Sequence, residues 1–99
     1  MVTKKYVKSR NVCQVTFELP AEGEAKQVHL VGDFNGWDQT GTPMKKVKGV
    51  WKATVDLELD REYQYRYLVS GSEWRNDPGA DKYVPNNIDG DNSVVVTTV

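Results

Sequence analysis

The chain has 99 residues, of which 38% are hydrophobic and 27% charged, and it carries a formal net charge of −1 at pH 7. This length accommodates one domain with a modest core, but not a core together with a deep catalytic cavity. The near-neutral charge argues against a nucleic-acid partner, whose phosphates need a basic face, and no apolar run approaches the roughly 20 residues of a membrane-spanning helix.

The chain begins with a basic segment that contains Lys4, Lys5, Lys8 and Arg10. It lacks the apolar stretch of a secretory signal, and we interpret residues 1–11 as a basic, solvated arm before a single domain at residues 12–99. From there on, turn residues interrupt the sequence about every ten residues, and no segment has a helical period. This spacing predicts an all-β sandwich or barrel.

Short alternating runs mark the expected strands, at residues 12–19, 27–32, 44–47, 50–57, 63–69 and 93–99. Alternation places the large apolar side chains on one face of each strand, so we assign to the core Phe17, Trp51, Tyr63, Tyr65 and Tyr67. A further element around Trp74 ends at Pro78, and residues 79–92 are expected to form a long polar loop. The total of about seven strands predicts an immunoglobulin-like sandwich.

Two tryptophans fall outside the alternating strands. Trp37 follows Asn35-Gly36, and Trp74 follows Gly71-Ser72-Glu73, so both lie in turn-like surroundings. Such residues either cap the ends of a sandwich or face water for a ligand. A flat indole matches the apolar C–H face of a pyranose ring, and aromatic area beside a few polar groups is the usual arrangement for orienting a polar ligand.

Polar side chains near these tryptophans could complete such a site. Arg66 lies on the face opposite the tyrosines, where its guanidinium could point to solvent and donate to hydroxyls, or could be an ordinary solvated residue. The loop at residues 83–92 carries amide side chains, which both donate and accept. The segment from Asp89 to Asn92 has only a superficial likeness to a calcium loop, without its spacing or closing glutamate.

Catalysis is not expected from these residues. His29 is the only histidine and lies in a predicted strand, so no Ser/His/Asp set is plausible, and no glycine-rich phosphate loop occurs. No metal or cofactor is predicted. The single cysteine, Cys13, allows no internal disulfide, which fits a reducing compartment, and we expect a cytoplasmic protein.

Five short segments occur in the order and spacing of a known family: Val28-His-Leu-Val-Gly-Asp-Phe-Asn-Gly-Trp37, Gly49-Val-Trp51, Glu62-Tyr-Gln-Tyr-Arg-Tyr67, Trp74-Arg-Asn-Asp-Pro78, and Asp91-Asn-Ser-Val-Val-Val96. Together they cover about residues 12–97 and resemble carbohydrate-binding module family 48. This family includes the isoamylase N-terminal domain and the glycogen-binding domain of the AMP-activated protein kinase β subunit. The resemblance implies an early-set, immunoglobulin-like β-sandwich that binds α-1,4-linked glucan chains without catalysis.

The same resemblance assigns roles to individual residues. The sugar-stacking tryptophans correspond to Trp37 and Trp74, and the basic residue of the site corresponds to Arg66. In the loop that follows, the resemblance implies an aliphatic residue that threads into a cyclic glucan, a polar pair before it and an asparagine that binds sugar hydroxyls. These positions fall on Ile88, on Asn86 and Asn87, and on Asn92.

Other functions fit the same scaffold. Some members of the family lie beside a catalytic barrel and act as structural neighbours rather than as sugar binders. The chain could accordingly be a protein-interaction module, or an accessory domain of a glycoside hydrolase family 13-type enzyme or of a kinase. The two tryptophans and the basic residue favour the sugar-binding alternative.

Overall fold

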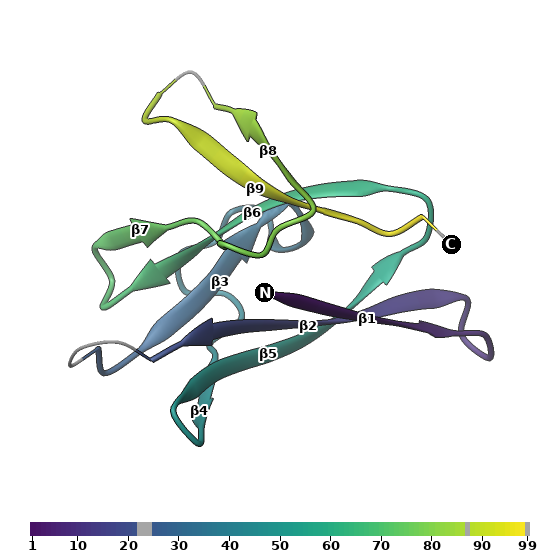
Figure 1. Ribbon diagram of the computed structural model, residues 1–99, viewed down its shortest axis with the longest axis horizontal. Coiled ribbons are helices and arrows are strands. Elements are labelled where there is room, and N and C mark those ends of the chain that lie inside the picture. Colours follow the sequence, from purple (N-terminus) through teal and green to yellow (C-terminus); the bar gives the residue numbers. More distant parts are fainter. Residues whose placement is uncertain (22–24, 87, 99) are drawn as a thin grey trace.

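A computed structural model describes residues 1–21, 25–86 and 88–98, and within these it contains nine β-strands and one short 3-10 helix. The strands form two antiparallel sheets packed face to face (Figure 1). The first sheet consists of β1 (Val2–Val7), β2 (Val12–Pro20), β5 (Val50–Glu58) and β4 (Lys45–Val47), in that order. The second consists of β3 (Val28–Gly32), β6 (Glu62–Val69), β9 (Asp91–Val96) and β8 (Lys82–Pro85), with β7 (Glu73–Arg75) paired to β6.

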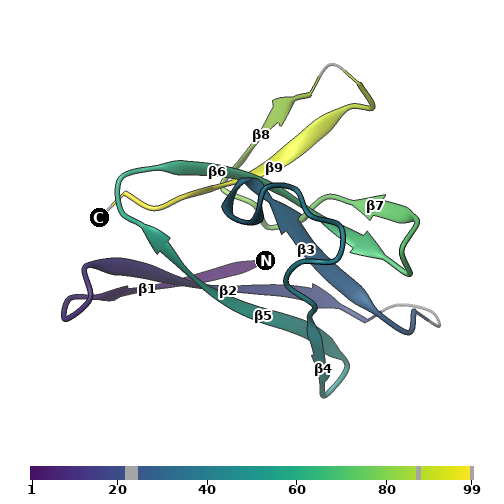
Figure 2. The same ribbon diagram turned by 180° about the vertical axis from the view of Figure 1, so that it is seen from behind.

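The strand orders are those of an immunoglobulin-like sandwich, in which strands A, B, E and D form one sheet and C, F and G the other. Here β1-β2-β5-β4 corresponds to the first set and β3-β6-β9 to the second. The segment after β3 begins with the 3-10 helix η1 (Asp33–Asn35) and crosses to β4 of the other sheet, as Figure 2 shows from behind. The predicted all-β sandwich is therefore confirmed.

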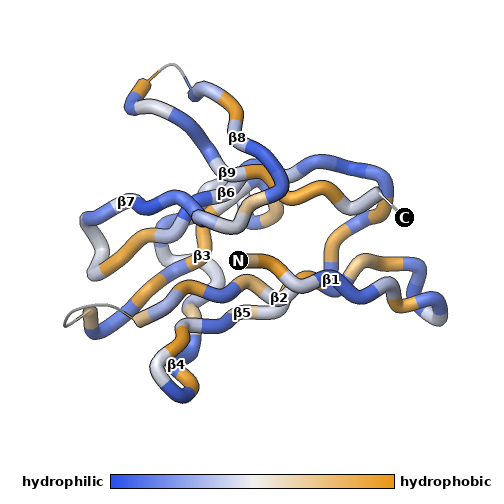
Figure 3. The backbone as a smooth tube through the Cα atoms, in the orientation of Figure 1, coloured by the Kyte–Doolittle hydropathy of each residue, from blue (hydrophilic) through white to orange (hydrophobic). Residues whose placement is uncertain are grey.

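The core lies between the sheets and follows the alternation read from the sequence. Hydrophobic and hydrophilic residues alternate along β2 and β5 (Figure 3). The inward side chains are buried, and those of Phe17, Tyr65 and Tyr67 are among the largest. Phe17 meets the edge of Tyr65 at a centroid distance of 4.9 Å, and Tyr65 meets Tyr67 at 5.9 Å. Edge-to-face packing at these distances adds to the free energy gained by burial.

The interpretation of the N-terminal residues as a solvated arm is wrong for Val2–Val7, which form β1. This strand pairs with β2 from Val2 opposite Phe17 to Val7 opposite Val12. Lys4 reaches across to the other sheet, where its ammonium lies 2.6 Å from Asp81. Lysines on an edge strand discourage pairing with strands of other chains. The lysines of β1 therefore belong to the edge strand of the first sheet rather than to a solvated tail.

The polar segment at residues 79–92 also contains more secondary structure than the predicted loop. It contains β8, whose residues pair with β9 from Lys82 opposite Val94 to Pro85 opposite Asp91. The element around Trp74 is the three-residue strand β7. Strands of three or four residues are too short to show the alternating hydrophobic pattern by which the longer strands were found.

Gly32 is the last residue of β3 and pairs with Tyr65 of β6. A Cβ atom at this position would lie 2.5 Å from the Gln64 carbonyl oxygen and 2.8 Å from the Tyr65 Cβ. Both neighbours belong to a central strand and cannot move freely. We therefore expect Gly32→Ala to destabilise the fold by about 1–3 kcal/mol, the usual penalty for overpacking, measured by urea denaturation.

Gly49→Ala is the matched control, because its added Cβ would meet no heavy atom within 4 Å, although its φ of +79° is unfavourable for alanine. Its loss should be limited to about 1 kcal/mol. A Gly32 variant no less stable than the Gly49 variant would contradict the steric explanation.

Candidate functional site

The outer face of the second sheet carries a pocket of about 540 Å³. Its lining consists of Trp37, Gln64, Arg66, Trp74, Pro85, Asn86, Ile88, Asp89 and Asn92. Six of the seven residues predicted from the sequence are thus brought together, and the seventh, Asn87, lies outside the described residues. The lining also includes three residues that the sequence did not point to, namely Gln64, Pro85 and Asp89.

Trp37 is held by the turn that follows β3. Its backbone amide donates to the Gly32 carbonyl at 2.9 Å, and its indole Nε1 donates to Asp33 Oδ1 at 2.9 Å. The second oxygen of Asp33 accepts from the Gln64 amide at 2.7 Å, which ties the turn to β6. The φ of Trp37 is +59°, a left-handed conformation that is unusual for a bulky residue. Such strain persists only where surrounding contacts over-determine it, and these three hydrogen bonds supply such contacts.

Trp74 stands on β7 rather than in a loop. It pairs with Leu68 of β6, so its side chain projects from the same outer face as Arg66. The guanidinium carbon of Arg66 lies 5.7 Å from the centre of the Trp74 ring. Both Trp37 and Trp74 are half-buried. Each indole therefore has a supported side and a side open to a ligand.

Arg66 does not extend into solvent as expected, since its side chain is only 12% exposed. Its Nη1 donates to both carboxylate oxygens of Asp89, at 2.9 and 3.0 Å. Among the described residues its Nε is buried without a hydrogen-bond partner. The arginine thus presents a fixed, partly neutralised guanidinium at the pocket rather than a mobile positive charge.

Amide side chains form a connected network along one wall of the pocket. Asn86 Nδ2 donates to Asn92 Oδ1 at 3.1 Å, and Asn92 Nδ2 donates to Gln64 Oε1 at 3.0 Å. Asn92 is only 9% exposed, so these bonds occupy a nearly buried amide. An amide oxygen has two lone pairs and an amide nitrogen two hydrogens. Gln64 therefore keeps its amide hydrogens and one lone pair for a polar ligand while orienting Asn92, whereas Asn86 uses both hydrogens and both lone pairs within the loop.

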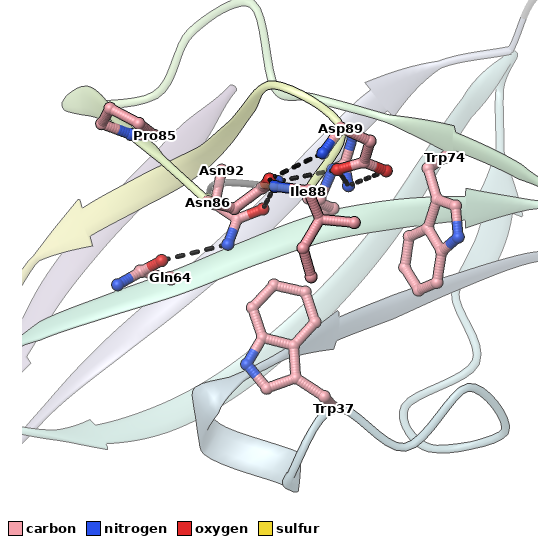
Figure 4. Close-up of a pocket in the computed structure, with 9 residues that line it drawn as sticks. Trp37, Gln64, Trp74, Pro85, Asn86, Ile88, Asp89 and Asn92 are labelled. Atoms are coloured by element: carbon pink, nitrogen blue, oxygen red, sulfur yellow. Dashed lines mark hydrogen bonds and ion pairs between the residues drawn. The ribbon is translucent and has the colours of Figure 1, made fainter.

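Ile88 is 91% exposed, the most exposed of the large hydrophobic side chains among the described residues. Figure 4 shows it projecting from the β8–β9 loop between the two indoles. Its backbone amide donates to Asn86 Oδ1 at 2.9 Å, which fixes the loop beneath it. Together with the two indoles, the exposed Ile88 side chain forms an interrupted apolar surface. A ligand with apolar faces would cover this surface and remove the Ile88 side chain from water.

Asp89 is the charged partner of Arg66 at the rim of the pocket. Hydrogen bonds from Arg66 and then from Asn86 hold the pKa of its carboxyl below the ordinary value, so it is ionised near neutral pH. Its oxygens face a guanidinium and an amide rather than a cation site. In the part of the chain that the structure describes, no three His, Cys, Asp or Glu residues are grouped to hold a metal ion.

Behind the pocket, the buried carboxylate of Asp77 anchors the segment that follows β7. Its Oδ2 accepts from the hydroxyls of Tyr65 at 2.7 Å and Tyr67 at 3.0 Å, and its Oδ1 accepts from the Gly79 amide at 2.9 Å and from the Met1 ammonium. Its backbone amide donates to Ser93 Oγ of β9 at 2.8 Å. The segment that follows β7 is thereby fixed to both β6 and β9.

The fold and this pocket define a small β-sandwich module with an aromatic-lined pocket on one sheet. The sequence profile of Carbohydrate-binding module 48 (isoamylase N-terminal domain) matches residues 6–86. The chain belongs to this family, as the sequence motifs indicated. The matched region includes Trp37, Arg66 and Trp74 and ends before Ile88 and Asn92.

Similar proteins fall into two groups. The chain is 39% identical over 61 residues to the 1,4-alpha-glucan branching enzyme of Nitratidesulfovibrio vulgaris, a match that covers 60% of this chain and 9% of the enzyme. It is 38% identical over 56 residues to the 5'-AMP-activated protein kinase subunit beta-1 of Sus scrofa, covering 57% of this chain and 43% of that subunit. The chain therefore spans only a small part of the branching enzyme and less than half of the kinase subunit. None of the described helices is long and apolar enough to cross a membrane.

Proposed function

We propose that the pocket binds α-1,4-linked glucan chains, such as those of glycogen, starch or maltooligosaccharides, by stacking glucose rings on Trp37 and Trp74. The observation that carries this proposal is the placement of the two half-exposed indoles on either side of Ile88, above a row of amide side chains. Glucose rings have apolar faces and hydroxyl edges, so one ring can use both surfaces at once. The family of the chain and the named substrate of the branching enzyme support the same ligand class.

The lining of the pocket favours binding without catalysis. Hydrolysis of a glycosidic bond usually needs two carboxyl groups placed on either side of it, one of them with a raised pKa. Among the described lining residues there is one carboxylate, Asp89, and its pKa is lowered by Arg66. A catalytic role would require residues outside this pocket, so we assign to the module the task of holding a glucan.

A titration with maltoheptaose, monitored by isothermal calorimetry, tests the proposal. We expect saturable binding in the micromolar to millimolar range, because shallow aromatic platforms bury little ligand and each stacked ring contributes roughly 1–3 kcal/mol by analogy with base stacking. Cellohexaose is the control, since it joins the same glucose units by β-1,4 linkages into a straight chain, whereas α-1,4 linkages give a curved one. A folded sample that gives no heat with millimolar maltoheptaose would exclude glucan binding.

A further inference from the structure

The pocket contains one positive and one negative side chain, and they are bound to each other. Arg66 Nη1 contacts both oxygens of Asp89 at 2.9 and 3.0 Å. The Arg66 side chain is 12% exposed and that of Asp89 49%, so the carboxylate lies on the solvent side of the pair. A ligand approaching the guanidinium therefore meets the carboxylate as well.

The loop holds Asp89 in place independently of the arginine. Asn86 Oδ1 accepts from the Asp89 backbone amide at 3.0 Å, and Asn86 Nδ2 donates to Asp89 Oδ1 at 2.8 Å. The Asn86 amide donates to the Gly90 carbonyl at 2.8 Å and closes the turn. These bonds position the carboxylate before any ligand arrives, so its contact with Arg66 is a built feature of the β8–β9 loop.

Charge compensation of this kind has a consequence for ligand choice. A guanidinium is well suited to phosphate, because its planar set of donors matches two phosphate oxygens. An unpaired arginine beside two tryptophans would thus attract a glucan that carries phosphate esters. With Asp89 at about 3 Å from the same guanidinium, the attraction of a phosphate to Arg66 is offset by its repulsion from the carboxylate.

We propose that Asp89 is a specificity-determining residue that cancels the charge of Arg66 and makes the pocket select neutral glucan chains against phosphate-bearing ones. This inference rests on the proposed function, since it concerns which glucans the same pocket accepts. Arg66 then serves as a rigid donor for hydroxyl groups and as a support for Trp74, and its charge does not recruit anions.

The test compares maltoheptaose with maltoheptaose that carries one 6-phosphate group, and its readout is the ratio of the two affinities. We expect the wild-type protein to bind the neutral sugar at least as tightly as the phosphorylated one, and we expect this ratio of affinities to change little with salt. In Asp89→Asn the ratio should shift toward the phosphorylated sugar by about three- to thirtyfold at about 20 mM salt, and the shift should disappear at about 500 mM salt. The double variant Asp89→Asn/Arg66→Gln should return to the wild-type ratio.

Asp91→Asn is the matched control, because it removes the same charge from an exposed residue two positions away that does not line the pocket. An equal shift in this variant would show a general charge effect and overturn the inference, as would an unchanged ratio in Asp89→Asn. A wild-type protein that prefers the phosphorylated sugar in a salt-dependent way would overturn it without any variant. If the folded wild-type protein binds neither sugar, both the proposed function and this inference fail. If it binds the neutral sugar but Asp89→Asn leaves the affinity ratio unchanged, only this inference fails.

Discussion

Alanine at position 37 or at position 74 is expected to weaken maltoheptaose binding by about 5- to 150-fold, while the sandwich stays folded. This range corresponds to the loss of about 1–3 kcal/mol for one aromatic platform. Both side chains are half-buried on the outer face of the second sheet, away from the core between the sheets. Their removal therefore deletes ligand-facing area without opening a core cavity.

Calorimetry is the appropriate measurement, because each variant removes one of the tryptophans whose fluorescence could otherwise report binding. Tyr6→Ala is the matched control: Tyr6 is an aromatic residue, 44% exposed, on β1 of the other sheet. It should bind maltoheptaose as the wild type does. Tryptophan variants that retain full affinity, with melting temperatures close to the wild type, would show that the indoles do not carry the binding.

Asp77→Ala is expected to have the largest effect on stability, a loss of about 3–5 kcal/mol, the usual result of removing one partner from a buried charged cluster. The substitution leaves the buried hydroxyls of Tyr65 and Tyr67 without their acceptor. Burial, together with neighbouring charged or hydroxyl groups, raises the pKa of both tyrosines, so they remain protonated donors that need an acceptor. Asp77→Asn keeps one oxygen and should lose less, about 1–3 kcal/mol. Urea denaturation at neutral pH measures both losses.

The same carboxylate predicts a pH dependence. Burial alone raises the pKa of Asp77, but hydrogen bonds from the Met1 ammonium, the Gly79 amide and the Tyr65 hydroxyl outweigh it and hold the pKa below its ordinary value. A carboxyl with a lower pKa in the folded than in the unfolded state stabilises the fold above the unfolded value, about pH 4, and this contribution is lost as the pH falls below it. The wild type should therefore lose stability between pH 5 and pH 3 more steeply than Asp77→Asn. Parallel curves for the wild type and Asp77→Asn would contradict the assignment.

The long strands could be predicted from the sequence because their burial follows a period of two. Phe17, Tyr65 and Tyr67 are buried as the alternation required. Strands β1 and β8 could not be found in this way, since a strand at a sheet edge such as Val2–Val7 buries little and its lysines resemble a solvated tail. Their pairing is decided by hydrogen bonds to a neighbouring strand that is distant in sequence, and single-sequence patterns do not contain this information.

The candidate site shows the same division. The two tryptophans were recognisable because they are large aromatic residues outside any alternating run, and Gln64 could have been added, since it lies two residues before Arg66 on the same face of one strand. The role of Asp89 could not be read in advance, because it depends on a contact between residues 23 positions apart, set by the conformation of the β8–β9 loop. The sequence pattern also predicted that Arg66 would face solvent, whereas in the structure its guanidinium is paired with the Asp89 carboxylate.

The left-handed backbone conformation of Trp37 lowers the stability of the fold at a residue that the proposed function requires. A non-glycine residue in this conformation costs on the order of 1–2 kcal/mol, and its φ of +59° is retained by hydrogen bonds to Gly32 and Asp33. A glycine at this position would relax the backbone and remove the indole at the same time. Selection for stability alone would thus favour glycine over tryptophan here, and under the proposed function the retained indole trades part of the domain's marginal stability for ligand binding.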